Sequence, residues 1–149
     1  MFCNHSVALL IASTLLCVST EVGAQNLLCS TEFASGISFD RTTRRWAATT
    51  FRPDAKYVVV KSEHPNAKYE VRQLGSGTAV AWCKSEYSQS GLLQCDGIFQ
   101  EFRFNKTGLR FLRTYTAGYW DEKDISGFDP KHQEGDSTPA MSAGTCATF

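Results

Sequence analysis

Apolar and polar residues alternate with a period of two along much of this chain. From residue 27 to residue 39 most odd positions are apolar and most even positions are polar, which predicts a long strand with its odd positions on one face. Asp40 and the four residues after it form a predicted turn, because an aspartate side chain bonds the backbone that follows it. Residues 45–51, rich in tryptophan, threonine and phenylalanine, predict the returning strand of a hairpin.

Six further strands are predicted downstream of this hairpin. They are residues 57–62, 68–74, 78–84, 97–104, 109–115 and 141–149. Residues 78–84 also fit a helical face, but the glycines and β-branched residues around them favour a strand. Short strands with a turn every 8–12 residues predict an all-β fold, a small antiparallel sandwich or barrel of seven to eight strands.

The first 24 residues have the layout of a cleaved secretory signal. Their apolar run at 7–18 is too short to span a bilayer, and a V-x-A exit precedes Gln25. We therefore expect residues 25–149 to fold as a single β domain in an oxidising space, periplasmic or secreted. A lipoprotein is the rival interpretation, but Cys17 follows two leucines where a lipobox needs small residues.

Four cysteines remain after the predicted leader, and they allow three disulfide connectivities. The connectivity Cys83–Cys95 with Cys29–Cys146 is preferred among the three. The first bond would close a short segment between neighbouring strands, and the second would tie the two ends of the domain together. A zinc site is the alternative use of cysteine, but the chain has no C-x-x-C motif and no His/Cys pair at ligand spacing.

The charges of the chain are balanced overall but unevenly distributed. With 15 basic and 15 acidic side chains the net charge is zero, and together with export this argues against a nucleic-acid binder. Residues 121–139 have no period and form a predicted loop, which carries six acids and two lysines. This loop is either an acidic flap over a basic face or a solvated loop beside a solvated sheet, and the second interpretation is favoured.

No catalytic constellation is found, and no cofactor is expected. The chain lacks a G-x-S-x-G elbow, and Ser76 lies between two glycines as part of a hairpin turn. Glu70, Glu86 and Glu101 lie among aromatic residues and are the candidate acid or base of a small hydrolase, although the sequence places no two of them in one cleft.

A cation site is the second chemical candidate, and it falls in the acidic loop. His132 is accompanied there by three acids, Asp129, Glu134 and Asp136, whose oxygens are ligands for a cation. The spacing of a calcium loop is absent, so a solvated loop is favoured and no metal is expected.

Arginines and aromatic residues lie together on two of the predicted hairpins. The candidate binding surface consists of Arg41, Arg44, Arg45, Trp46, Arg110 and Arg113. Such residues recognise partners by stacking and by bidentate bonds to carboxylate or phosphate groups. The simpler interpretation, which we favour, is that the aromatic residues fill the core while the arginines face water.

The residues that repeat a known pattern are spread over nearly the whole mature chain. They are Cys29, 36–40, Thr43, Trp46, Cys83, Cys95, 102–105, 109–111 and 144–146. In these positions the chain resembles a group of small uncharacterised exported proteins of Gram-negative bacteria, which implies export and disulfides but no activity. A looser likeness, to the disulfide-linked β-barrels that inhibit lysozymes in the periplasm, implies architecture alone.

Three functions are open at this point. The leading hypothesis is an exported binding or structural domain without a catalytic site, whose partner is another exported protein or an anionic envelope component. No nucleic acid partner and no membrane span in the mature chain are expected. The second is a periplasmic protein inhibitor of a cell-wall hydrolase that inserts a loop into the enzyme's cleft. The third is the small hydrolase.

Overall fold

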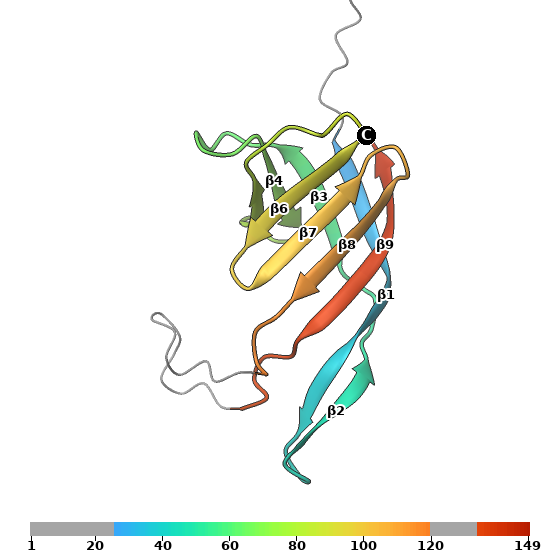
Figure 1. Ribbon diagram of the computed structural model, residues 1–149, viewed down its shortest axis with the longest axis vertical. Helices are drawn as coiled ribbons and strands as arrows, with labels where there is room; N and C mark the ends of the chain where they lie inside the picture. The colour runs from blue at the N-terminus through green and yellow to red at the C-terminus, as the bar shows by residue number, and fades with distance from the viewer. Residues whose placement is uncertain (1–25, 120–133) are drawn as a thin grey trace, which may run out of the picture.

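The computed structural model describes residues 26–119 and 134–149, which form nine antiparallel strands (Figure 1). The strands are β1 (Leu27–Asp40), β2 (Arg45–Thr50), β3 (Lys56–Lys61), β4 (Tyr69–Gln73), β5 (Ala79–Cys83), β6 (Leu92–Gly97), β7 (Gln100–Asn105), β8 (Arg110–Tyr115) and β9 (Ala140–Thr148). All strands except β2 close into an eight-stranded barrel, because β1 pairs with both β3 and β9. The predicted all-β antiparallel fold is confirmed, and it is a barrel.

The sequence predicted eight of the nine strands and missed β6. Within it only Leu93 and Cys95 are buried apolar residues, so the alternation is too short to stand out from the polar residues around it. Its pairing with β7 runs over six residue pairs. The ambiguous segment at 78–84 forms β5, so the preference for a strand there is confirmed.

Side chains fill the interior of the barrel. The ring of Tyr57 packs edge-on against Phe102 at 5.0 Å between centroids, and Phe104 stacks between Phe102 and Phe111 at 5.8 and 6.0 Å. Leu27 is also almost completely buried in this cluster. An eight-stranded barrel is just wide enough for side chains to fill. The interior is therefore a packed core, as it is in other small closed sheets.

Both predicted disulfides are present, and both lie in the core. Cys29 and Cys146 lie directly opposite each other on β1 and β9, where they bond across a ladder of nine residue pairs. Cys83 and Cys95 join β5 to β6. In the described sheet β5 and β6 share a single registered residue pair, so this second disulfide holds the barrel together where its hydrogen-bonded ladder is shortest.

Strand β1 changes the face that it buries partway along its length. Its register against β9 shifts between Thr31 and Phe33, and the bulge leaves the side chain of Phe33 70% exposed. The prediction that the odd positions of 27–39 share one face is therefore wrong beyond Thr31, because the extra residue of a bulge reverses the alternation. Past the bulge β1 pairs with β2, and the two strands project beyond the barrel (Figure 1).

Two of the sequence predictions fall on parts of the chain that are not described. The leader at 1–24 lies outside the described residues, and so does the acidic loop up to residue 133. Within 26–119 and 134–149, no helix is long and apolar enough to cross a membrane.

Candidate functional site

Residues 35–50, which we call the projecting hairpin, extend from the barrel as a two-stranded arm. Their register runs from the pair Ser35–Thr50 to the pair Asp40–Arg45, with a four-residue turn between the strands. None of these residues belongs to the buried core cluster. Ser35 and Gly36, at its base, still pair with β9, whereas the rest of the projecting hairpin is a surface element that contributes no side chain to the core.

The turn of the projecting hairpin is held by the side chain of Asp40, as its sequence predicts. One carboxylate oxygen accepts the backbone N–H groups of Thr42 and Thr43 at 2.8 and 3.3 Å, and the other accepts the Thr43 hydroxyl at 2.8 Å. These bonds, first the hydroxyl and then the amides, lower the pKa of Asp40. Arg44 closes the turn with a φ of 56°, in the left-handed region.

Trp46 anchors one face of the projecting hairpin. Its ring lies 5.5 Å from that of Phe39 and 5.5 Å from that of Tyr119, measured between centroids. The indole Nε1 donates to the carboxylate of Glu134 at 3.1 Å. Gly135 lies so close to Phe39 that an added Cβ would approach it to 2.6 Å. Residues on both sides of the undescribed segment 120–133 therefore contact the hairpin.

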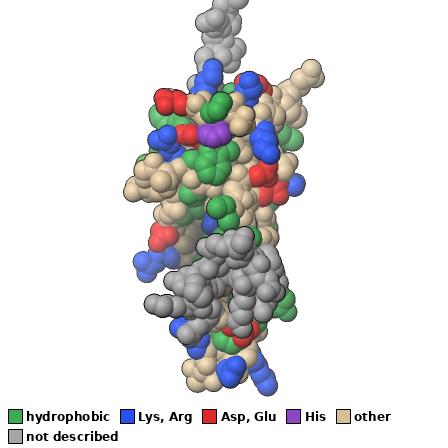
Figure 2. Space-filling view, turned by 90° about the vertical axis from the view of Figure 1, so that its left-hand side faces the viewer, with side chains coloured by type: hydrophobic (Ala, Val, Ile, Leu, Met, Phe, Trp, Pro, Cys, Tyr) green, Lys and Arg blue, Asp and Glu red, His purple; other side chains and the backbone are tan. Residues whose placement is uncertain are grey.

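The arginines of the projecting hairpin and its flank are only partly neutralised. Arg41 forms an ion pair with Asp136. Arg44, Arg45 and Arg52 are exposed, and in the described ranges none of them forms an ion pair. Figure 2 shows lysine and arginine side chains at the lower tip of the molecule, where Figure 1 draws the turn of this hairpin. The tip is therefore a basic surface.

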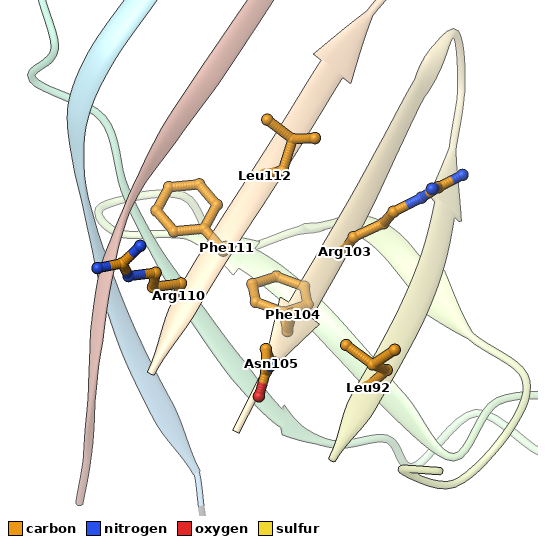
Figure 3. Close-up of a pocket in the computed structure, with 7 residues that line it drawn as sticks. All are labelled: Leu92, Arg103, Phe104, Asn105, Arg110, Phe111 and Leu112. Atoms are coloured by element: carbon orange, nitrogen blue, oxygen red, sulfur yellow. The ribbon is translucent and has the colours of Figure 1, made fainter. Parts of the chain in front are cut away.

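Arg110 lies elsewhere, beside a shallow groove on the outside of the barrel. The groove has a volume of about 210 Å³ and lies over β6, β7 and β8, with Leu92, Arg103, Phe104, Asn105, Arg110, Phe111 and Leu112 along it (Figure 3). Figure 3 shows Arg103 and Arg110 on opposite sides of it and pointing apart. Because their guanidinium groups do not converge, they do not form a joint site for one anion.

Arg113 is half-buried and points into the barrel, away from its outer wall. Arg113 on β8 is registered opposite the buried Phe102 on β7, so the two side chains lie on the same, inner face of the sheet. Its guanidinium lies over three rings, those of Tyr57, Phe102 and Tyr115, at 6.0, 5.8 and 5.4 Å from the centroids, and its Nε donates to Gln100 at 2.9 Å. Burial raises the pKa of Tyr57, although the nearby guanidinium opposes the shift. Arg113 therefore packs the barrel interior and lies apart from the hairpin arginines.

Two of the three candidate carboxylates of a hydrolase, Glu70 and Glu101, lie far apart on the sheet. Glu70 and Glu101 share a cross-strand row, but Trp82 and Asp96 lie between them on β5 and β6. Three strand spacings amount to about 14 Å, more than the 5–9 Å at which two carboxylates cooperate on a glycosidic bond. The geometry of the described residues therefore gives no support to this pair as an acid and a base.

Each of these carboxylates is also engaged by a neighbour. Arg72 Nε donates a hydrogen bond to Glu70 at 2.7 Å, and Arg103 Nε donates one to Glu101 at 2.6 Å. The Tyr69 hydroxyl donates to Glu86 at 2.7 Å. Burial, followed by the bond to Glu86, raises the pKa of Tyr69 to about 12. These contacts are those of ion pairs and hydrogen bonds that stabilise the sheet.

The candidate cation ligands are divided by the boundary of the described chain. Asp129 and His132 lie outside the described residues. Glu134 accepts a hydrogen bond from Trp46, and Asp136 forms an ion pair with Arg41. Among the described residues no group of three or more His, Cys, Asp or Glu side chains could hold a metal ion.

Tyr119 is a neighbour of Trp46 that the sequence pattern does not indicate. The two residues are far apart along the chain, and the contact depends on where the turn after β8 meets the hairpin. The pattern of alternation carries no signal for such a contact.

Comparison of the chain with protein-family models, with curated proteins and with solved structures finds no match.

Proposed function

We propose that this chain is an exported binding domain without catalytic activity, and that the projecting hairpin is its binding element. Two disulfides are consistent with an oxidising location outside the cytoplasm. The described interior of the barrel is packed with its own side chains, which makes the projecting hairpin the more accessible candidate. The observation that carries the proposal is an arginine-rich arm that extends from a closed, filled barrel.

The chemistry of the tip defines the kind of partner. Arg44 and Arg45 present planar guanidinium groups, which bind carboxylate or phosphate groups through two parallel hydrogen bonds. The turn beneath them is fixed by Asp40, and the hairpin face is fixed by Trp46, so little conformational freedom remains to be lost on binding. The partner is another exported protein with an acidic surface or an anionic component of the cell envelope.

A cross-linked pull-down from a periplasmic extract tests this proposal. The double variant Arg44→Ala/Arg45→Ala should capture the partner at least about tenfold less than the unmodified protein, because the variant removes two exposed guanidinium groups that form no ion pair within residues 26–119 and 134–149. The matched control is Arg103→Ala/Arg110→Ala, which removes two arginines from the barrel wall and should capture normally. Equal capture by both double variants would show that the hairpin is not the binding element.

Inhibition of a cell-wall hydrolase is the second candidate function. The observation in its favour is the shape of the projecting hairpin, a narrow arm with a basic tip. Glycosidases cut their substrate between two carboxyl groups at the bottom of a cleft, and such a cleft is complementary to arginine. Lysis of cell walls by lysozymes, with the protein at micromolar concentration, provides the test. If none is slowed, this second function is wrong while the binding proposal stands.

A further inference from the structure

Strand β2 has one edge without a partner in the described part of the chain. In the order of the sheet β2 is the terminal strand, and it pairs with β1 alone. An unpaired strand edge presents N–H and C=O groups to which another extended chain can bond.

The hydrogen-bond pattern shows which residues of β2 face this free edge. The N–H group of Phe51 donates to the carbonyl of Ala34 at 2.9 Å, so these two residues form a hydrogen-bonded pair. Hydrogen-bonded and non-hydrogen-bonded pairs alternate along an antiparallel ladder. The N–H and C=O groups of Trp46, Ala48 and Thr50 therefore point away from β1, toward the free edge.

Between Trp46 and Thr50 the free edge of β2 has no proline, charge or bulge to block strand addition; the charges, Arg45 and Arg52, and Pro53 lie at its two ends. Natural proteins protect edge strands with proline, inward-facing charges, bulges or lysine. From Trp46 to Thr50 the sequence contains only Trp, Ala and Thr, and its pairing with β1 is regular. Ala47 and Ala48 at the centre are small and exposed, so they present no steric barrier to an approaching strand.

Every charged side chain within residues 41–53 is an arginine, while Asp40 and Asp54 flank this range and Glu134 and Asp136 contact Trp46 and Arg41, respectively. From residue 41 to residue 53 there are four arginines and no acidic residue. Arg45 begins the strand and Arg52 follows it, at about 23 Å along an extended chain. A strand added to this edge would therefore meet positive charge at both of its ends.

This charge distribution argues against a second copy of the chain as the added strand. When Ala48 pairs with Ala48 of the second copy, Arg44 lies opposite Arg52 of the other chain. Like charges directly opposite each other destabilise a sheet. An extended segment with acidic side chains at both ends is complementary instead.

We infer that the free edge of β2 binds an extended, acidic segment of another protein by strand addition. This inference rests on the proposed function and names the partner's chemistry. The backbone groups of Trp46, Ala48 and Thr50 extend the sheet to the new strand. The guanidinium groups of Arg44, Arg45 and Arg52 pair with its acidic side chains.

Three synthetic peptides of about ten residues serve as probes. The first alternates threonine and valine and has two aspartates at each end. The second replaces one central valine with proline and keeps every aspartate, so that its charge is unchanged while its ladder is broken. The third replaces the aspartates with lysines. The first peptide should bind at least about tenfold more tightly than the other two.

Amide hydrogen exchange of the complex, followed by nuclear magnetic resonance, gives the residue-level test. With the first peptide bound, exchange at Trp46, Ala48 and Thr50 should slow at least about tenfold. Ala47 and Thr49 already donate to β1 in the free protein, so their exchange should change much less. Equal binding of the first two peptides, or slowing without this alternation, would overturn strand addition.

Two variants separate this inference from the proposed function. Ala48→Pro removes an edge-facing N–H group without changing the charge, and it should abolish binding of the first peptide. Arg45→Glu/Arg52→Glu keeps the backbone and should reverse the preference between aspartate and lysine peptides. If the pull-down partner depends on Arg44 and Arg45 but binds Ala48→Pro normally, strand addition is wrong and the binding function stands. Sedimentation that shows a dimer lost in Ala48→Pro would instead identify a second copy as the occupant.

Discussion

Removal of the two disulfides one at a time should affect the barrel in two different ways. The perturbations are the double variants Cys29→Ala/Cys146→Ala and Cys83→Ala/Cys95→Ala. All four sulfur atoms lie in the core, so the loss of buried volume is similar in the two variants. The difference between them therefore reports the cross-link and the strands that it joins.

Global stability should fall further when the long-range bond is removed. The bonds span 117 and 12 positions of the sequence. The chain-entropy relation assigns about 5 kcal/mol to the longer loop and about 3 kcal/mol to the shorter one. Local opening of the strands should instead be greater when the Cys83–Cys95 bond is removed. Strands β1 and β9 share nine registered pairs, whereas β5 and β6 share only the pair Trp82–Asp96.

Urea unfolding measures the first effect, and amide hydrogen exchange measures the second. In Cys83→Ala/Cys95→Ala, the amides of β5 and β6 that face each other should exchange at least about tenfold faster than those between β1 and β9. In Cys29→Ala/Cys146→Ala, the β1–β9 amides should exchange only with global unfolding. Full protection of the β5–β6 amides in Cys83→Ala/Cys95→Ala would refute the argument that this disulfide holds β5 and β6 together in place of a longer hydrogen-bonded ladder.

Two further predictions concern pH and a close backbone contact. Because burial raises the pKa values of Tyr69 and Tyr87 to about 12, the folded state holds these protons above pH 10, where the unfolded state begins to lose them. The contribution of these two tyrosines to the free energy of unfolding should therefore be constant below pH 10 and fall as the pH rises toward about 12. Denaturation at a series of pH values, with phenolate absorbance to follow the titration, measures this fall; an unchanged free energy of unfolding between pH 10 and 12 would contradict the shifts. Gly144→Ala should destabilise the protein by about 1–3 kcal/mol, because its Cβ would meet the Ser30 carbonyl in the barrel wall. Gly77→Ala, in open space, is the control and should have little effect in the same denaturation assay.

The disulfides and the closed sheet followed from local regularities of the chain. Alternation marked most strands, and cysteines at 29 and 146 lay in the first and last of them. Once the first and last strands pair, these cysteines become neighbours, so the connectivity was accessible from spacing. The turn at Asp40 was accessible for the same reason, because its bonds reach only two and three residues along the chain.

The remaining features depend on contacts between distant residues. The bulge after Thr31 arises where β1 exchanges one neighbour for another, and alternation in a single strand does not record its neighbours. Arg113 carries a charge that composition assigns to the surface, yet three aromatic rings hold it inside the barrel. Arg41, Arg44 and Arg45 lie together on the first hairpin, while Arg110 and Arg113, both on β8, lie on the outer wall and in the interior.

Because no side chain between residues 35 and 50 belongs to the barrel's core cluster, the exposed positions of the arm beyond Ser35 and Gly36, which pair with β9, can diverge with little effect on the scaffold. Mutations at its exposed positions, such as Arg44 and Arg45, act mainly on recognition, whereas mutations of Asp40, Trp46 or the barrel interior also act on folding. Foreign sequences of equal length could be grafted onto the arm for display, with the two cystines keeping the support intact. The same separation would let related chains share one framework and recognise unrelated targets.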